Sequence, residues 1–412
     1  MPLSPAHRRL LVVGMGDDGW AGLAEGVRER ILAADVLLGG ARHLALIPAR
    51  PSGTEQRRQA WPSPLRSGLP GLLDQLGDTD VVALASGDPL VSGIGSTLID
   101  LLGPDRVEIV PAVSSVALAR AAMRWPAESC ETVSVVGRAV DVVRRQLAPG
   151  RRLLLLSSDE TTPLAVAGLL VESGYGHSAV TVLAHLGGAA EQVFPTLSAT
   201  DLVSATTPYP RLTVIAVDCV GPHRGGWTAG LPDDAFEHDG QLTKRDLRAS
   251  ALARLAPTPG EHLWDVGAGA GSIGIEWMRA HPTCTTTAFE GHPDRAARIA
   301  RNAARLGVPG LAVVEGRAPA VLTEGTVAAP DAIFIGGGAT RDGVIDACLA
   351  ALRPGGRLVV HGVTLETERV LAERYLAHGG ELTRLAVETT APVGTFTGWS
   401  PARTVTQWAL TV

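Results

Sequence analysis

The sequence predicts an α/β protein with two consecutive domains, and three observations lead to this fold class. The chain has 412 residues, more than one hydrophobic core usually organises. Short apolar segments alternate with helical stretches along the chain, which is the pattern of βα units and parallel sheets. Residues 221–235 (GPHRGGWTAGLPDDA) interrupt this alternation with four Gly and two Pro, which indicates a linker. We therefore expect one domain at 1–220 and a second at 236–412.

The composition supports two well-packed cores. Hydrophobic residues make up 45% of the chain and charged residues 19%, so extended disorder is not expected. Aromatic residues are only 4%, so aliphatic side chains must fill the cores, as in sheets covered by helices on both faces. The formal net charge of −6 argues against a nucleic-acid-binding protein, which would usually carry a basic face.

The cysteines and the N-terminal segment indicate a cytoplasmic protein without a metal site. No CxxC pair and no His at ligand spacing accompanies the four cysteines, which read as reduced thiols: Cys130, Cys219, Cys284 and Cys348. The apolar run at 10–13 ends at Gly14, too short for the core of a signal peptide. No segment approaches the roughly 18 consecutive apolar residues of a membrane span.

The first domain is expected to contain seven strands joined by helices. The apolar segments that predict them are 9–14, 80–85, 106–110, 132–137, 152–157, 179–184 and 211–217. Residues 165–173 predict a helix that ends before Gly174, because glycine commonly takes the left-handed position just after a helix.

The second domain repeats the alternation and ends differently. Helices are expected at 243–255, 272–280, 293–306, 342–352 and 366–377, with strands at 262–267, 284–290, 311–315, 331–336 and 357–363. Two longer β segments follow at 381–390 and 402–412. They predict an antiparallel hairpin at one edge of a parallel sheet.

A glycine-rich turn is the most informative segment of the second domain. In LWDVGAGAGSIGIEW (263–277) a buried strand ends near Asp265, and alternate glycines lead into a helix. The N–H groups at the start of that helix attract an anionic ligand. Glu290 closes the next strand, where a carboxylate can bind the hydroxyls of a ribose. The alternative is a plain strand-to-helix turn whose glycines serve packing.

A dinucleotide site is the other interpretation of this turn. Gly269, Gly271 and Gly274 spell GxGxxG, but in that fingerprint the first glycine closes the strand, and here Gly267 does so. Counted from Gly267, the third glycine position holds Ser272. The D-x-G-x-G-x-G form and the terminal hairpin instead resemble class I S-adenosylmethionine-dependent methyltransferases.

This resemblance extends through the second domain. VVEGRAPA (313–320), DAIFIGGG (331–338) and LRPGGRLVV (352–360) look like the adenine-contacting turn and the fourth and fifth strands of that Rossmann-like fold. Residues 231–255 resemble the decarboxylating precorrin methyltransferases, in which a Thr before the first helix reaches the cofactor. The implied cofactor-binding residues are Thr243, Gly267, Ala268, Gly269, Ala270, Gly271, Glu290 and Ala318. Lys244 is the only lysine among the 36 basic residues. Its place in this motif indicates either that arginine could not replace it there or that the single lysine lies there by chance.

Three turns of the first domain resemble the tetrapyrrole methylases. They lie in VVGMGDDG (12–19), LASGDPLVSGIGSTL (84–98) and VPAVSSVALARAAMRW (110–125). That family has a two-lobed α/β fold with S-adenosylmethionine in the cleft between the lobes, and the resemblance covers about 8–220. LAADVLLGGARHLALIP (32–48) is similar to the branch that methylates carbon 5.

The resemblance implies which residues of the first domain bind the cofactor. They are Ser86, Gly87, Asp88, Val91, Ser114 and Ser115. The side chain of Asp88 could instead cap the following helix. The first GxG loop is implied to line the active site, but Asp17 replaces the proline of most relatives and receives no role. Arg42 and His43 could bind substrate carboxylates or be an ordinary solvated pair.

Together the resemblances match the fused, decarboxylating precorrin methyltransferases. They imply two S-adenosylmethionine molecules per chain, an anionic tetrapyrrole substrate and methylation at carbons 5 and 15. Loss of carbon dioxide from the ring C acetate accompanies the second methylation, and a homo-oligomer is expected. Arg317 and Arg341 could bind substrate carboxylates or lie on the surface, and no catalytic residue is evident. A pyridine-nucleotide oxidoreductase and a non-catalytic corrinoid-binding module are the alternative functions.

Overall fold

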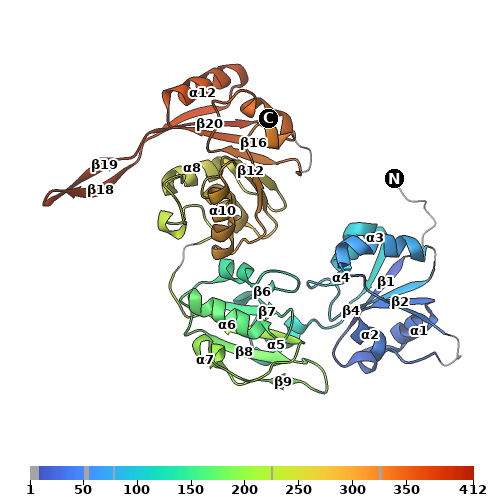
Figure 1. The fold of residues 1–412 in the computed structure, drawn as a ribbon. Helices are drawn as coiled ribbons and strands as arrows, with labels where there is room; N and C mark the ends of the chain where they lie inside the picture. The colour runs from blue at the N-terminus through green and yellow to red at the C-terminus, as the bar shows by residue number, and fades with distance from the viewer. Residues whose placement is uncertain (1–8, 51–54, 78, 224–225, 324–326) are drawn as a thin grey trace. The chain divides into compact units, whose positions relative to one another are not determined.

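The computed structural model describes residues 9–50, 55–77, 79–223, 226–323 and 327–412. Contacts between these residues group the chain into two compact units. The first comprises Met1–Val140 with Ala148–Pro222, and the second comprises Asp141–Leu147 with His223–Val412. Figure 1 colours the first unit blue to green and most of the second yellow to red.

The first lobe of the first unit is a parallel sheet between two layers of helices. Its strand order is β3-β2-β4-β1-β5, and every pair in it is parallel. The strands are β1 (Leu10–Met15), β2 (Val36–Gly39), β3 (Arg57–Ala60), β4 (Val81–Ser86) and β5 (Val107–Val110). The helices are α1 (Glu25–Ala33), α2 (Ala41–Leu46), α3 (Leu65–Leu76) and α4 (Ile94–Leu102). Val12 packs on the α3 face and Val13 on the α1 face, because side chains alternate along a strand.

The second lobe has a mixed sheet, which corrects the prediction of parallel sheets throughout. Its strand order is β10-β8-β11-β7-β6, with β9 paired to β8. Of these pairs only β6 and β7 are parallel, and β11 runs antiparallel to both its neighbours. The strands are β6 (Cys130–Ser134), β7 (Arg152–Leu156), β8 (Ala179–Ala184), β9 (Gln192–Val193), β10 (Leu197–Ser198) and β11 (Thr213–Asp218). Its helices are α5 (Ser115–Met123), α6 (Thr162–Glu172) and α7 (Ala199–Val203). An apolar strand buried on both faces looks the same in either direction, so its sequence does not encode its polarity.

Local predictions in the first unit differ from the structure in two ways. The strand expected at 132–137 ends at Ser134, and four strands lie outside the predicted segments: β2, β3, β9 and β10. β3 has mostly exposed residues at the edge of its sheet, so it lacks the apolar signal of a strand.

The second unit has a sheet with an antiparallel end. Its strand order is β14-β13-β12-β15-β16-β20-β17, in which the first five strands are parallel and β20 is antiparallel to β16 and β17. The parallel strands are β12 (His262–Val266), β13 (Thr285–Glu290), β14 (Ala312–Glu315), β15 (Ala332–Ile335) and β16 (Arg357–Gly362). The helices are α8 (Arg245–Leu255), α9 (Ser272–Ala280), α10 (Pro293–Arg305), α11 (Val344–Ala351) and α12 (Leu365–His378). A dinucleotide-binding sheet would carry a sixth parallel strand, so this order favours the methyltransferase fold.

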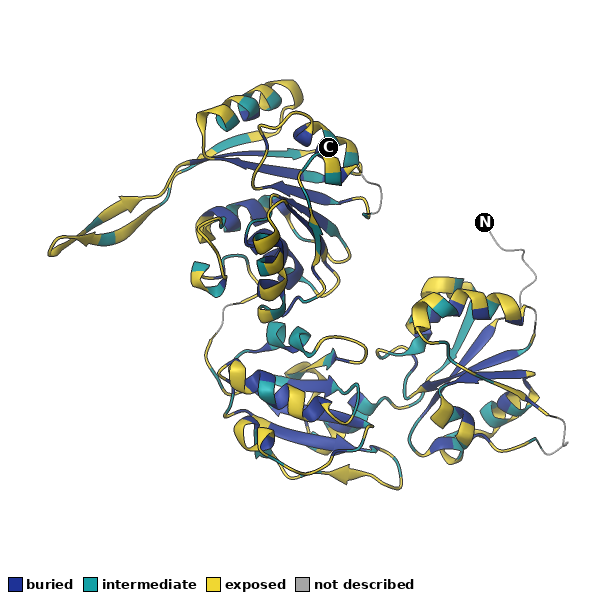
Figure 2. Cartoon of the chain, in the orientation of Figure 1, coloured by how far each residue is buried: buried dark blue, intermediate teal, exposed yellow. Residues whose placement is uncertain are grey.

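The end of the chain forms four strands where two were predicted. β17 (Glu381–Leu385) and β20 (Val405–Thr411) belong to the main sheet. Among the described residues, β18 (Glu388–Val393) and β19 (Phe396–Pro401) pair only with each other and form the long hairpin in Figure 1. The hairpin is mostly exposed in Figure 2. β17 ends at Leu385 and β18 begins at Glu388, but the β pattern predicted at 381–390 continues across residues 386–387. The sequence therefore does not show where one strand ends and the next begins.

Part of the predicted linker packs into the second unit. Leu231 is buried in the core cluster that also contains Leu263 and Ile273, and residues 233–235 form a short 3-10 helix. Residues 224 and 225 of this segment lie outside the described residues.

Candidate functional site

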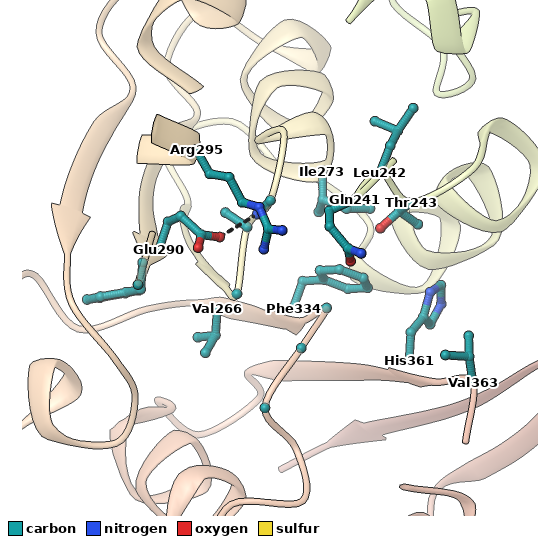
Figure 3. A pocket seen from close by; sticks show the side chains of 18 of the residues that line it. Gln241, Leu242, Thr243, Val266, Ile273, Glu290, Arg295, Phe334, His361 and Val363 are labelled. Carbon is teal, nitrogen blue, oxygen red and sulfur yellow. Dashed lines mark hydrogen bonds between the residues drawn. The ribbon is translucent and has the colours of Figure 1, made fainter. Parts of the chain in front are cut away.

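A large cavity lies at the carboxyl ends of β12, β13, β15 and β16 in the second unit. Its volume is about 820 Å³. Six predicted cofactor-binding residues line it: Thr243, Gly267, Ala268, Gly269, Glu290 and Ala318. Figure 3 shows Glu290 toward one end of the cavity and His361 toward the other, with Phe334 between them. Parallel strands bring their carboxyl ends to one edge of the sheet, so turns distant in sequence meet there.

The glycines of the first turn are required by both conformation and space. Gly267 and Gly269 have φ of +68° and +60°, values that side chains rarely adopt. A Cβ at Gly267 would lie 2.9 Å from the carbonyl oxygen of Gly337, and one at Gly269 would lie 2.9 Å from that of Gln241. These glycines therefore serve close backbone packing and also line the cavity wall.

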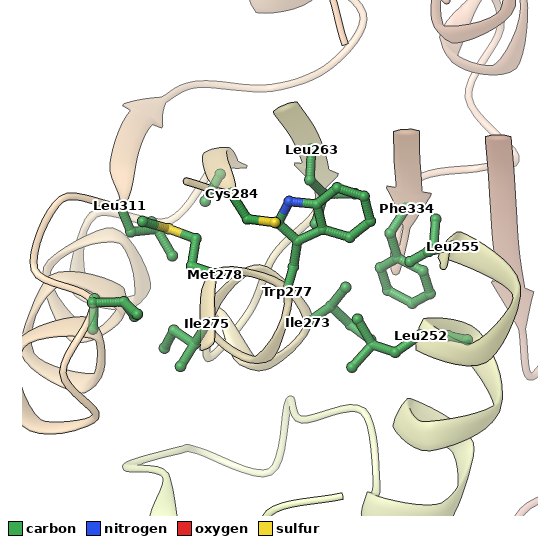
Figure 4. Packing of buried hydrophobic residues seen from close by; sticks show 14 of the residues in the cluster. Leu252, Leu255, Leu263, Ile273, Ile275, Trp277, Met278, Cys284, Leu311 and Phe334 are labelled. Atoms are coloured by element: carbon green, nitrogen blue, oxygen red, sulfur yellow. The ribbon is translucent and has the colours of Figure 1, made fainter. Parts of the chain in front are cut away.

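The remaining residues of the turn lie behind the cavity wall. Ala270 is 1% exposed, and a Cβ at Gly271 would approach Ile299 to 2.8 Å. They are not among the described residues that line the cavity. The following helix, α9, is anchored by Trp277, which is fully buried among apolar side chains (Figure 4). This packing fixes the turn relative to the sheet.

Glu290 is held in place at the end of β13. Its Oε2 accepts the Gly269 N–H at 2.9 Å, and its Oε1 accepts the His292 N–H at 3.0 Å. Each carboxylate oxygen has a further lone pair for a hydroxyl donor. The fixed carboxylate can therefore accept two hydroxyl groups of a ligand in the cavity.

Asp265 lies beneath the turn and not in the cavity lining. Its Oδ2 accepts the Gly274 N–H at 3.0 Å, while Oδ1 has no partner among the described residues. Burial, with a smaller effect of the Glu290 charge, raises the pKa of Asp265 to about 7. An unfolded Asp has a pKa of about 4, so the protonated carboxyl stabilises the fold at low pH. That contribution is lost as the pH rises from about 4 through about 7.

A buried ion cluster positions the segment that carries Thr243. Arg248, fully buried, donates to the carbonyl oxygens of Thr243 and Leu231 and to Glu276 Oε1. Lys244, which also lines the cavity, is half exposed, and its Nζ lies 3.5 Å from Asp233 Oδ2.

Arginines surround the cavity. Arg317 and Arg341, the two arginines that were candidates from the sequence, both line it, as do Arg295 and Arg403. Arg295 pairs with Asp239 at 2.9 Å. Within the described part of the chain, Arg317 and Arg341 form no ion pair, so their charges are available to an anionic ligand.

His361 is a cavity residue that sequence reasoning missed. The Gln407 amide nitrogen donates to His361 Nε2 at 2.8 Å, and the amide oxygen accepts from Arg254 Nε at 3.0 Å. The ring packs edge-on against Phe334, with centroids 5.0 Å apart. Burial lowers the pKa of His361 to about 4, so the imidazole is neutral at pH 7. A histidine at the carboxyl end of an apolar strand, in LVVHG, was the available signal.

A smaller cavity of about 70 Å³ lies between the two lobes of the first unit. Of the predicted residues, Ser86, Gly87 and Ser115 line it. The GxG and GDP turns lie against each other, because the Gly87 N–H donates to Met15 O at 2.7 Å. A Cβ at Gly14 would lie 2.2 Å from the Gly87 carbonyl oxygen. The second lobe contributes apolar residues that were not predicted: Leu183, Leu186, Leu212 and Val214.

Three predicted residues of the first unit lie outside that lining. Asp88 accepts the Leu90 N–H at 2.9 Å. The N-cap of α4 is Gly93, so the interpretation of Asp88 as its cap is wrong. Ser114 caps α5 by accepting the Ala117 N–H at 3.1 Å, and Val91 packs against the core of the second lobe.

Asp17 joins residues from both lobes at the smaller cavity. Its Oδ1 accepts from Arg42 at 2.7 Å, and its Oδ2 lies 2.9 Å from His185 Nδ1. Arg42 Nη2 also lies 2.9 Å from His43 Nε2. Arg42 and His43 therefore contact each other, and Arg42 contacts Asp17. Burial, with the charge of Arg42, lowers the pKa of His43 to about 4.

The described residues include no helix long and apolar enough to span a membrane. The same residues contain no cluster of three or more His, Cys, Asp or Glu that could hold a metal ion.

Comparisons with known proteins agree with the two folds. The family of tetrapyrrole (corrin/porphyrin) methylases matches residues 9–200, and the precorrin methyltransferase domain matches residues 234–412. A Sinorhizobium protein named precorrin-6Y C(5,15)-methyltransferase (decarboxylating) is 45% identical over 406 residues, 98% of this chain and 96% of that protein.

Two shorter relatives come from Salmonella typhimurium. One, named cobalt-precorrin-6B C(15)-methyltransferase (decarboxylating), is 34% identical over 158 residues, 37% of this chain and 80% of that protein. The other, named cobalt-precorrin-7 C(5)-methyltransferase, is 34% identical over 176 residues, 42% of this chain and 83% of that protein.

Proposed function

This chain belongs to the precorrin-6Y C(5,15)-methyltransferase (decarboxylating) family, and on that premise we propose that it methylates a precorrin at carbons 5 and 15. It also removes carbon dioxide from the ring C acetate, as a step of cobalamin synthesis. The observation that carries this proposal is the presence of two separate cavities, each built on the turns of a different methyltransferase fold. The first unit acts at carbon 5 and the second at carbon 15.

The large cavity of the second unit, called the second cavity below, fits S-adenosylmethionine by its size and by the groups on its wall. Sites for ligands of this size span roughly 300–1,000 Å³, and the cavity of about 820 Å³ lies within that range. Gly267 and Gly269 line the wall, and Glu290 can accept the ribose hydroxyls. The smaller cavity of the first unit, about 70 Å³, lies below that range.

S-adenosylmethionine, when bound, supplies an electrophilic methyl group. The protein positions the reactants and excludes water from the site. Arg317 and Arg341 hold carboxylates of the anionic substrate at the second cavity. When carbon dioxide leaves the acetate, the conjugated imine of the substrate accepts the electron pair. Incubation with labelled S-adenosylmethionine and precorrin-6B should yield two labelled methyl groups and one carbon dioxide per product. A product with neither label nor loss of carbon dioxide would contradict the proposal.

Two binding sites per chain are expected for S-adenosylhomocysteine, and Glu290→Ala should weaken one of them. Loss of the charge-assisted hydroxyl contacts costs about 1.5–3 kcal/mol, or about 10–150-fold in Kd. Calorimetry of the intact chain measures both sites. The matched control is Glu315→Ala, at the exposed end of the neighbouring strand and outside the cavity lining, which should leave both affinities unchanged. Unchanged binding by Glu290→Ala would remove the ribose assignment.

We also propose that the chain self-associates through the β18–β19 hairpin and resides in the cytoplasm. A two-stranded hairpin alone is marginally stable in water. This one exposes Phe396 to 80% and Trp399 to 70%, which a partner copy would cover. The four cysteines are free, as suits a reducing compartment.

Replacing Phe396 and Trp399 together with Ser should reduce the assembly to single chains, because the apolar surface that a partner copy would cover is removed. Sedimentation equilibrium would measure the mass. Leu376→Ser, which removes an equally exposed apolar side chain from α12, serves as the control and should keep the wild-type mass. A wild-type chain that sediments as a monomer at micromolar concentration would contradict self-association.

A further inference from the structure

Three charged or titratable side chains meet at the small cavity of the first unit. Arg42 donates to Asp17 Oδ1 at 2.7 Å, and His185 Nδ1 lies 2.9 Å from Asp17 Oδ2. The Asp17 side chain is 14% exposed and lines the cavity together with Ser86, Gly87 and Ser115. Both carboxylate oxygens are therefore fixed at the wall of the proposed methylation site.

The backbone around Asp17 is shaped to hold it there. His185 has φ of +51°, a left-handed conformation that non-glycine residues adopt rarely and that is common at functional sites. A Cβ at Gly188 would lie 2.5 Å from Asp17 Oδ2, so glycine makes room for the carboxylate. An incidental surface ion pair would need neither feature.

Asp17 also supplies the carboxylate on this wall. Among the described residues that line the cavity, it is the only carboxylate, and the other polar side chains are hydroxyls and the guanidinium of Arg42. A guanidinium stays protonated in proteins, and hydroxyls are much weaker bases than a carboxylate. The His185 side chain is 32% exposed and bonded to Asp17, which provides a route for a proton to solvent.

We propose that Asp17 is a catalytic residue that accepts the proton released when carbon 5 is methylated, with His185 and Arg42 as positioning residues. This role rests on the proposed function of the first unit. The reacting carbon belongs to an enamine system that bears an N–H group. The electron pair of the enamine C=C bond forms the bond to the methyl group as the methyl–sulfur bond breaks and leaves its electron pair on sulfur. In the same step the nitrogen lone pair forms a C=N bond, and the N–H proton passes to Asp17.

The test compares Asp17→Asn and Asp17→Ala with the wild-type chain. Asparagine can keep the contacts with Arg42 and His185 but cannot accept the proton. Label from ¹³C-methyl S-adenosylmethionine appearing at carbon 5 is followed by NMR in a single turnover. Asp17→Asn should slow it at least about 100-fold, the usual contribution of a general base. Calorimetry should show unchanged S-adenosylhomocysteine binding, and Asp105→Asn, an exposed carboxylate of the first lobe outside the cavity lining, should keep the wild-type rate.

Chemical rescue separates catalysis from a structural role. Formate can occupy the space left in Asp17→Ala and accept the proton, so it should restore part of the rate in that variant alone. A wild-type rate in Asp17→Asn, or no rescue of an Asp17→Ala chain that still binds S-adenosylhomocysteine at both sites, would overturn the role of Asp17. A wild-type chain that places no label at carbon 5 would instead overturn the proposed function.

Discussion

Replacing Glu276 with Gln is expected to lower the free energy of unfolding of the second unit by about 3–5 kcal/mol. Arg248 is fully buried, and its Nε donates to Glu276 Oε1 at 2.5 Å. The same carboxylate accepts the N–H groups of Gly230 and Leu231 at 2.6 and 3.0 Å. Gln would leave a buried guanidinium without its nearest counter-charge and turn one amide N–H₂ toward other donors. Asp233, 3.3 Å from Arg248, still neutralises part of the guanidinium charge. The loss in the free energy of unfolding should therefore lie toward the lower end of that range.

Hydrogen exchange of amides in α8 and α9, measured across a urea series, would isolate the second unit from the first. Glu373→Gln is the matched control, because it breaks an exposed ion pair with Arg369 in α12 and should change stability by less than about 1 kcal/mol. Because Arg248 also holds the Thr243 carbonyl, Glu276→Gln should weaken S-adenosylhomocysteine binding at the second cavity only. Equal stabilities of Glu276→Gln and Glu373→Gln would show that the buried cluster contributes little.

Separating the two units should separate the two chemistries. We propose domains at 1–220 and 236–412 with a linker at 221–235, and each domain has its own sheet and core. A fragment ending at Val220 should methylate carbon 5 and release no carbon dioxide. A fragment beginning at Ala229 should release carbon dioxide and methylate carbon 15. The second fragment needs Gly230 and Leu231, because their N–H groups bind Glu276.

Carbon dioxide release and the position of a ¹³C-methyl label would be measured for each fragment, with an equimolar mixture of both as the control. Residues Asp141–Leu147 group with the second unit, so the second fragment should be more stable when the first is present. Carbon dioxide released by the first fragment alone would overturn the assignment of chemistry to the units. An insoluble fragment would count against the proposed domain boundaries.

The sequence by itself determined the elements that depend on local patterns. Apolar runs at 9–14 and 262–267 correspond to β1 and β12, and the alternate glycines after β12 predicted a turn into α9. These predictions succeeded because an apolar run of five or six residues and a glycine with positive φ are set by nearby residues. The resemblance of the motifs identified the family, which the comparison over 98% of the chain confirmed.

Only the tertiary structure decided how distant residues meet. The direction of β11, the separate β18–β19 hairpin and the contacts of Asp17 with Arg42 and His185 depend on pairings far apart in sequence. The same holds for His361, which reaches the cavity because β16 lies beside β15, and for Glu276, whose partners lie 28 or more residues away. Local sequence sets the spacing of buried apolar residues along each helix or strand. Strand direction and side-chain partners are set by which surfaces pack together when the whole chain folds.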